Sequence, residues 1–201
     1  MLKFPCVVPK LWLRLDHITY GRHLKLVGWP AIFRYPHARL QIGEHVTINS
    51  SFFSNLLGLY QRMIIVARGT GKIVIGDRVG MSGSTIYARE SITIGDDTLI
   101  GANCKIIDND FHPIDPEERL SGSLDHLKTK PVVIGKNVFI GCNSIILKGT
   151  VLGDNCVVGA GSVVSGTYEA GSVVAGNPAR VVDRGDGSFA TDKYMIRRRE
   201  I

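Results

Sequence analysis

His112 is the residue of this chain whose type and neighbours are best suited to chemistry. It stands in the run Asp-Asn-Asp-Phe-His-Pro at 108–113, where Asp108 and Asp110 place two carboxylates close to the imidazole. Imidazole titrates near neutrality and can take a proton from a hydroxyl group as a general base. A nearby carboxylate could fix the imidazole tautomer or bind a substrate hydroxyl, although Asp and Asn are also common in turns. His112 is therefore the candidate base, with Asn109 and Asp110 as candidate substrate contacts.

His112 lies where a six-residue repeat of aliphatic residues is interrupted. The repeat runs through Ile134, Ile140, Ile146, Leu152, Val158 and Val164, and earlier through Ile94, Ile100 and Ile106. Position 112 is the next step after Ile106, so the repeat itself should fix its backbone. A constant period indicates stacked structural units. Each hexad predicts one short strand and a turn, and three hexads predict one triangular coil.

The repeat predicts an all-β fold, a parallel β-helix with the aliphatic residues inside. An antiparallel sandwich would instead show period-2 alternation with variable turns. Glycine follows many of the repeat residues, and we expect it to supply the φ > 0 angles that tight corners need. The segment 51–63 breaks the repeat and predicts a loop, one extra residue before Ile94 predicts a corner insertion, and a polar loop should protrude at about 112–130. The predicted organisation is a lead-in at 1–23, the β-helix at 24–183 and a basic tail at 184–201.

Composition bounds the remaining possibilities. The chain has 201 residues, a hydrophobic fraction of 44% and a net charge of +6, with basic residues gathered near both ends. No nucleic-acid-binding motif accompanies that charge, so a phosphate-rich small ligand or a peripheral contact with an anionic membrane surface fits it equally well. The four cysteines show no CxxC spacing and predict reduced thiols and no metal site. No apolar run of eighteen residues and no signal peptide is present, which predicts a cytoplasmic protein.

The regular repeats resemble a known enzyme family. Residues 134–164, the run Val-Ala-Gly-Asn-Pro-Ala-Arg-Val-Val at 174–182 and the Asp-Phe-His-Pro motif are similar to the hexapeptide-repeat acyltransferases. Within these, the chain looks most like the maltose, galactoside and nodulation-factor O-acetyltransferases and those of surface-polysaccharide synthesis, over about residues 70–183. The resemblance implies a left-handed β-helix, a homotrimer, acetyl-CoA bound between subunits and no metal. The left hand comes from the resemblance alone, since it opposes the usual right-handed crossover rule.

The resemblance also assigns roles to residues. The family places the catalytic base at the histidine of the His-Pro pair, here His112, and acetyl transfer is direct, so Cys142 is not a nucleophile. Corner amides would donate to the oxyanion of the tetrahedral intermediate. The residues that match coenzyme A contacts of the family are Cys142, Ala160, Ser165 and Arg180, with Phe139 where a tryptophan often stands and Lys148 or Arg184 as further charges for the phosphates. A guanidinium such as that of Arg180 pairs well with phosphate oxygens.

The acceptor region departs from the maltose and galactoside enzymes. Their asparagine-rich segment reads Gly-Met-Ser-Gly-Ser-Thr-Ile-Tyr-Ala-Arg at 80–89 in this chain. Met81 replaces a key asparagine, and Arg89 replaces an acidic acceptor ligand, while Ser82, Ser84 and Tyr87 could supply hydroxyl contacts. Free maltose or a β-galactoside is therefore in doubt. An arginine favours an anionic or phosphate-linked sugar, such as a polysaccharide repeat unit or a nucleotide- or lipid-linked glycan.

Three other functions are weighed against saccharide O-acetylation. N-acetylation of an amino sugar needs the same base and groove, and the sequence leaves it open. A carbonic anhydrase of similar architecture would need three converging imidazoles, but only His112 and His126 lie in or beside the loop. A non-catalytic scaffold would not require Phe-His-Pro at the break in the repeat.

Overall fold

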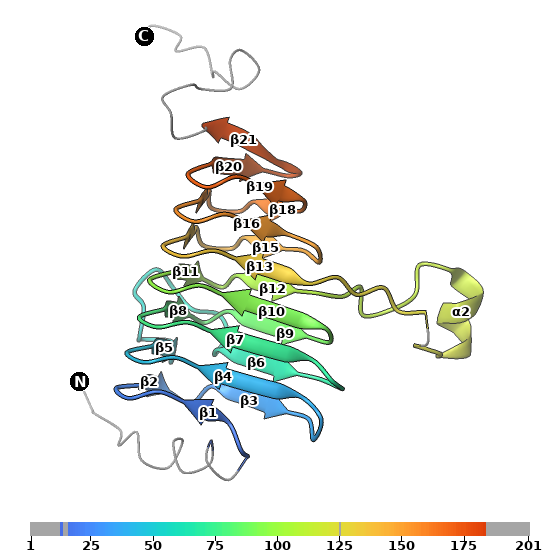
Figure 1. Cartoon of the computed structure of the whole chain (residues 1–201), viewed down its shortest axis with the longest axis horizontal. Coiled ribbons are helices and arrows are strands. Elements are labelled where there is room, and N and C mark those ends of the chain that lie inside the picture. Colours follow the sequence, from blue (N-terminus) through green and yellow to red (C-terminus); the bar gives the residue numbers. More distant parts are fainter. Residues whose placement is uncertain (1–12, 14–15, 125, 184–201) are drawn as a thin grey trace, which may run out of the picture.

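The computed structural model describes residue 13 and residues 16–124 and 126–183, which form a triangular parallel β-helix (Figure 1). Sheet A contains β1 (Thr19–Tyr20), β4 (Arg39–Ile42), β7 (Lys72–Ile75), β10 (Ser91–Ile94), β13 (Val132–Ile134), β16 (Val151–Leu152) and β19 (Thr167–Tyr168). Sheet B contains β2 (Lys25–Gly28), β5 (Thr47–Ser50), β8 (Gly80–Ser82), β11 (Leu99–Ala102), β14 (Phe139–Ile140), β17 (Val157–Val158), β20 (Val173–Gly176) and β21 (Ala179–Asp183). Sheet C contains β3 (Ala31–Arg34), β6 (Ile64–Ala67), β9 (Thr85–Ala88), β12 (Lys105–Ile107), β15 (Ile145–Ile146) and β18 (Val163–Val164).

The aliphatic repeat forms three buried columns, one for each sheet. Ile134 lies between Ile94 and Leu152 in sheet A. In the same way, Ile140 pairs with Ile100 and Val158 in sheet B, and Ile146 pairs with Ile106 and Val164 in sheet C. All nine side chains are buried. Because burial of one such side chain stabilises by about 1.5–3 kcal/mol, many short strands together hold the coil. The predicted repeat and fold class are confirmed.

The glycines of the repeat act differently from what the sequence predicted. Gly135 and Gly141 do not have positive φ; instead, residues further into the turns do, such as Asn137 (φ 52°) and Asn143 (φ 60°). A Cβ on Gly141 would lie 2.5 Å from the backbone nitrogen of Ala160 in the next coil. The expectation of left-handed glycines was wrong at these positions. Glycine is needed there because successive coils approach too closely for any side chain.

Polar side chains inside the corners link one coil to the next. Where sheet A turns into sheet B, which we call the A–B corner, the backbone amide of Glu44 donates to Asp77 at 2.7 Å and that of Lys136 donates to Asp154 at 2.7 Å. At the B–C corner, the Cys104 thiol donates to the carbonyl of Gly141 at 3.2 Å. Burial raises the pKa of the Cys104 thiol, and the three cysteines described, Cys104, Cys142 and Cys156, are free thiols. A buried thiol of this kind is a structural group and a poor nucleophile.

Two loops interrupt the helix, as the repeat predicted. The segment 51–63 joins β5 to β6 at the B–C corner. The second loop, 108–131, leaves from the C–A corner between β12 and β13 and extends far from the rod (Figure 1). It carries the short helix α2 (Pro116–Ser121), which Asp115 caps at its N-terminus and Gly122 at its C-terminus. The helix was not part of the sequence prediction, although Asp-Pro-Glu-Glu is a typical helix start.

The ends of the β-helix are visible within the described residues. Strand β1 lies before residue 24, the predicted start of the β-helix, and it pairs in parallel with β4. At the other end, β21 pairs antiparallel with β20. The predicted domain boundaries stay predictions, since most of the lead-in and the tail at 184–201, including Arg184, lie outside the described residues. No helix in the described part of the chain has the length and apolar character needed to cross a bilayer.

Candidate functional site

His112 lies at the base of the protruding loop, on the C–A corner. The two legs of this loop pair with each other: the backbone amide of Asp110 donates to the carbonyl of Lys128 at 3.2 Å, and the backbone amide of Lys130 donates to the backbone carbonyl of Asp108 at 2.9 Å. The amide of His112 donates to the carbonyl of Asp110 at 2.7 Å, and its side chain is exposed. The backbone of His112 is thus fixed while its imidazole ring remains accessible, as a general base requires.

Asp108 and Asn109 support this turn from below. Asp108 is fully buried, and its carboxylate accepts hydrogen bonds from the backbone amides of Arg89 at 2.9 Å and Glu90 at 2.7 Å. The side chain of Asn109, which is also buried, donates to Asp108 at 3.0 Å and accepts from the amide of Phe111 at 3.0 Å. Asn109 was predicted to touch substrate, but its amide group is occupied by the turn. Its structural part is to hold the backbone that leads to His112.

Asp110 is the carboxylate that faces the site. One of its oxygens is paired with the ammonium of Lys148, which lies on the same corner one coil further on. The other oxygen, Oδ2, is buried and has no hydrogen-bond partner among the described residues. A buried acceptor without a donor is costly and usually marks a site that a ligand or water completes. Lys148 was predicted to contact coenzyme A; here it neutralises and positions Asp110.

A polar pocket of about 230 Å³ opens beside His112. Its lining consists of Asp110, His112, Pro113, Ile114, Asp115, Glu118, His126 and Lys128. Across the protruding loop, the Nδ1 atom of His126 lies 2.6 Å from a carboxylate oxygen of Glu118. The pocket therefore brings the candidate base His112 together with Asp110 and with the cationic side chain of Lys128. Among the described residues, no group of three or more His, Cys, Asp and Glu side chains could hold a metal ion.

The predicted coenzyme A contacts are divided between two corners of the prism. Cys142 and Ala160 occupy successive coils of the B–C corner, where the amide of Gly161 donates to the carbonyl of Cys142 at 2.8 Å. Ser165 lies on the C–A corner with His112 and Lys148. A single chain does not bring the two groups together.

The remaining donor candidates lie elsewhere on the surface. Phe139 stands on the outer face of sheet B next to Leu99, and both side chains are exposed. Arg180 is exposed on β21, where its guanidinium donates to the carbonyl of Ala179 at 2.8 Å. Both are accessible to a ligand bound along the upper coils.

The acceptor candidates differ in their accessibility. Met81 is 1% exposed and pairs with Ile48 and Ile100 in the core column of sheet B, so its side chain is not available to a substrate. The hydroxyl of Ser82 is also buried and accepts from the side chain of Asn49 at 3.1 Å. These two predicted acceptor contacts are structural in this fold. The match to the acceptor segment of the family suggested them, although Met81 stands six residues after Ile75 and so continues the buried aliphatic repeat.

Arg89 is partly exposed on the C–A corner, one coil before His112. Along the same corner lie aromatic and basic residues of which the sequence had indicated only Tyr87. The rings of Tyr87 and Phe111 lie 4.8 Å apart. Arg68 donates to the hydroxyl of Tyr87 at 3.3 Å and lies 5.5 Å from the ring centre of Tyr35. Together, Tyr35, Arg68, Tyr87 and Phe111 form a basic and aromatic ladder that ends beside His112. Successive members are 33, 19 and 24 residues apart, so no constant spacing in the sequence marks them as one group.

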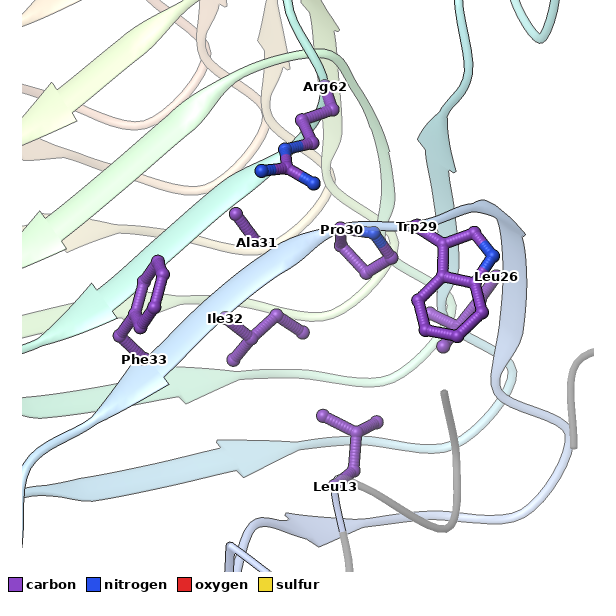
Figure 2. Close-up of a pocket in the computed structure, with 8 residues that line it drawn as sticks. All are labelled: Leu13, Leu26, Trp29, Pro30, Ala31, Ile32, Phe33 and Arg62. Carbon is purple, nitrogen blue, oxygen red and sulfur yellow. The ribbon is translucent and has the colours of Figure 1, made fainter. Parts of the chain in front are cut away.

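A second, apolar pocket of about 240 Å³ lies at the N-terminal coil (Figure 2). Trp29 and Pro30 at the turn between β2 and β3 border it, together with Leu13 and Ile32, and Arg62 is its charged residue. It has no acid, base or nucleophile, and it lies three coils before the loop that carries His112. It is not a candidate reaction site.

Comparison with known proteins agrees with these features. A family model described as the hexapeptide repeat of succinyl-transferase matches residues 91–107 and 131–165. An Escherichia coli K12 protein named for O-acetyl transfer in lipopolysaccharide biosynthesis, WbbJ, is 37% identical over 172 residues, which cover 83% of this chain and 82% of the relative. The chain belongs to the hexapeptide-repeat O-acetyltransferases. As a member of this family it is an acyltransferase.

Two solved structures have the same architecture. NeuO, described as a polySia-specific acetyltransferase, matches with a TM-score of 0.63 at 25% identity, over 89% of this chain and 75% of that chain. The N-acyltransferase AntD of Bacillus cereus, solved with dTDP and coenzyme A, matches with a TM-score of 0.65 at 23% identity, over 86% and 88% of the two chains. At 23% identity, the likeness to AntD concerns the fold alone, which is the left-handed β-helix of this acyltransferase family.

Proposed function

We propose that this hexapeptide-repeat O-acetyltransferase moves the acetyl group of acetyl-CoA to a hydroxyl of an anionic saccharide, with His112 as the general base. The observation that carries the proposal is the juxtaposition, at one polar pocket, of an exposed imidazole with Asp110, whose Oδ2 has no hydrogen-bond partner among the described residues. A family member needs such a base, because a sugar hydroxyl is a weak nucleophile until its proton is removed.

The proposed reaction is a direct transfer. An unprotonated nitrogen of His112 takes the proton of the acceptor hydroxyl while the hydroxyl oxygen attacks the thioester carbon. The tetrahedral intermediate then collapses, the carbon–sulfur bond breaks, and the proton held by His112 passes to the departing coenzyme A thiolate. Asp110 supports this cycle by stabilising the imidazolium or by binding the acceptor, and Lys148 holds Asp110 in place through their ion pair. The thiol of Cys142 takes no part.

The donor and acceptor halves of the site come from different subunits in this proposal. Cys142 and Ala160 lie on the B–C corner and His112, Lys148 and Ser165 on the C–A corner of one chain. A coenzyme A that touches both groups therefore bridges two copies. Contacts between two different surfaces are heterologous, and they close into a ring when the rotation permits. A homotrimer, with Arg180 and Phe139 as further contacts for coenzyme A, fulfils that requirement.

The acceptor is proposed to carry negative charge. Arg89 and Arg68 stand on the corner that leads to His112, and the rings of Tyr87 and Phe111 offer flat apolar faces on which sugar rings can stack. Guanidinium groups bind carboxylate and phosphate oxygens well. The relative WbbJ is named for lipopolysaccharide biosynthesis and NeuO for polysialic acid, an acidic polysaccharide. We place the reaction in surface-glycan synthesis in the cytoplasm, with a peripheral membrane contact if the acceptor is lipid-linked.

The second candidate is N-acylation of an amino sugar, since AntD is an N-acyltransferase of the same fold. The test uses acetyl-CoA with matched neutral, uronic-acid and amino sugars, and mass spectrometry of the products before and after hydroxylamine. An O-acetyl ester is removed by hydroxylamine and an amide is not. We expect a labile product formed fastest on the uronic acid. A stable product formed only on the amino sugar would establish the second candidate, and faster transfer to the neutral sugar would contradict the anionic acceptor.

A further inference from the structure

The segment 51–61 carries the most exposed apolar side chains of the described rod. Phe53 is 84% and Leu56 95% exposed, and Phe52, Leu57 and Tyr60 are more than half exposed. The whole segment, Ser-Phe-Phe-Ser-Asn-Leu-Leu-Gly-Leu-Tyr-Gln, contains no charged residue. A monomeric surface rarely presents so many large apolar groups together, and such a patch commonly marks an interaction surface. The proposed reaction described above does not use it.

Hydrogen bonds hold this apolar loop in one place on the rod. The side chain of Asn103 donates to the carbonyl of Gly58 at 2.9 Å, and the amide of Tyr60 donates to Asn103 at 3.3 Å. The ammonium of Lys105 donates to Gln61 at 2.7 Å and lies 5.6 Å from the ring centre of Tyr60. Burial under the loop lowers the pKa of Lys105. The loop is therefore fixed on the B–C corner of the coil that contains β11 and β12, directly before the coil of Cys142.

A second apolar patch lies at the same height on a different corner. The loop 108–131 leaves the same coil at the end of β12, on the C–A corner. There Ile114 is mostly exposed, Leu120 is 88% exposed, and Phe111 and Leu124 are partly exposed. The two patches cannot meet within one chain, because they lie on opposite sides of sheet C.

The charges around the two patches are complementary. Arg62 and Lys105 flank the apolar loop, whereas the segment 111–124 carries Asp115, Glu117 and Glu118 against the single arginine Arg119, and Glu118 also contacts His126. Opposite charges on two surfaces steer and orient their association. Two different patches at equal height meet when a second, parallel copy is rotated about an axis along the rod. This is the heterologous geometry that closes into a ring.

We propose that the apolar loop 51–61 docks onto the C–A corner of a second copy of this chain, against the segment 111–124 beside that copy's His112. The proposal rests on the proposed function, because it assigns a place to this loop in the intersubunit site. Ala160 and Ser165, which match coenzyme A contacts of the family, lie toward the C-terminal coils, whereas the apolar loop lies toward the N-terminal ones. The loop therefore closes the end of the site at which the acceptor binds. An acceptor sugar would then lie between the aromatic ladder of one subunit and the apolar loop of its neighbour.

The test introduces the photo-reactive residue p-benzoylphenylalanine at Leu57 of the full chain, with Thr93 as the matched control. Thr93 is exposed at a similar height on the outer face of sheet A. After irradiation we expect a covalent dimer from the Leu57 variant, with the new bond mapped by peptide mass spectrometry to residues 111–124, and none from the Thr93 variant. Light scattering before irradiation reports the oligomer.

The possible results separate the two proposals. A trimer whose Leu57 variant gives no cross-link to 111–124 overturns the docking of the loop and leaves the intersubunit site standing. A monomer overturns both. Flotation of the Leu57 variant with phosphatidylglycerol vesicles, together with loss of any protein cross-link, would assign the loop to a membrane and overturn the proposal. As an independent variant, Leu57→Asp should weaken the trimer several-fold and raise the KM for acceptor, while Thr93→Asp should change neither.

Discussion

Two neighbouring aspartates at the base of the protruding loop have different tasks. Asp108 is enclosed by the backbone amides of the preceding coil, so it fixes the turn. Asp110 has one oxygen on Lys148 and one without a donor among the described residues, so it faces the chemistry. Both are aspartates two residues apart, and their hydrogen-bond partners separate the structural carboxylate from the candidate functional one.

The ion pair between Asp110 and Lys148 predicts coupled effects on activity. Each of Asp110→Asn and Lys148→Met should lower kcat about tenfold or more, because a hydrogen bond to a charged group contributes about 1.5–3 kcal/mol. The double variant should lose little beyond either single variant, with a coupling energy within about 0.5–3 kcal/mol. Steady-state kinetics of the four proteins measure this. If Lys148→Met instead weakened coenzyme A binding and its effect added to that of Asp110→Asn, Lys148 would be a donor contact.

Met81 provides a test of the core assignment. Met81→Ala should lower the free energy of unfolding by about 2–5 kcal/mol, as removal of a large core side chain does. Met81→Leu should cost less than about 1.5 kcal/mol. Both variants, assayed below their melting temperatures, should keep the KM for acceptor. Denaturant unfolding and kinetics on the same preparations check it, and a raised KM in the stable Leu variant would restore Met81 to the acceptor site.

Among single residues, those that the repeat or a motif places could be predicted from the sequence. The sequence predicted His112 and the placement of Cys142 and Ala160 on one corner, because a six-residue register and a motif carry that information. It could not separate Asn109 from Asp110 as a substrate contact, since their hydrogen bonds come from the previous coil and from the returning leg of the loop. It named Tyr87 but missed Tyr35, Arg68 and Phe111 as its neighbours, because successive coils of 33, 21 and 20 residues obscure which residues share a corner.

At the scale of elements, the coil depends on close contact between successive turns. The strands are short, down to two residues each in the upper coils, and the aliphatic columns and the corner hydrogen bonds hold them in register. The register and both interruptions could be predicted from sequence. The reason why glycine follows the repeat residues could not be predicted, because the sequence pattern is the same whether glycine is needed for a positive φ or for its lack of a side chain.

This difference can be measured at one corner. Gly141→Ala should destabilise by about 1–3 kcal/mol or more, since its Cβ would meet the backbone of Ala160. Gly161→Asn is the matched control: Gly161 has φ 71° with open space around it, and asparagine tolerates that conformation. Thermal unfolding at one fixed protein concentration should show a clear loss for Gly141→Ala and little change for the control. Equal stability of the two variants would contradict close packing as the role of Gly141.

At the scale of the whole molecule, one chain displays the two halves of the proposed site on separate corners. His112 projects from the C–A corner, and Cys142 and Ala160 line the B–C corner. Nothing in a repeat of six reveals which corners meet between copies, so the sequence alone supported a shared site only through resemblance. The topology agrees with that proposal, since His112 and the residues matched to coenzyme A contacts on the B–C corner lie apart in one chain.

The division of the site predicts complementation between inactive variants. His112→Ala removes the base, and Ala160→Trp fills the opposite corner where coenzyme A is proposed to lie. Each variant alone should be inactive, whereas oligomers assembled from a mixture should recover a fraction of the wild-type rate. Recovery arises because some interfaces combine an intact C–A corner with an intact B–C corner. Absence of recovery in oligomers shown by mass spectrometry to be mixed would mean that each subunit holds a complete site.

The most direct test of the central claim is the acetyl-transfer rate of His112→Ala. Release of coenzyme A from acetyl-CoA in the presence of acceptor should fall about 10²–10⁴-fold, the usual contribution of a general base. Coenzyme A binding, measured by calorimetry, and the melting temperature should stay close to wild type, because the imidazole is exposed and supports neither. A rate for His112→Ala equal to that of wild type, in a protein that still binds coenzyme A, would contradict the account.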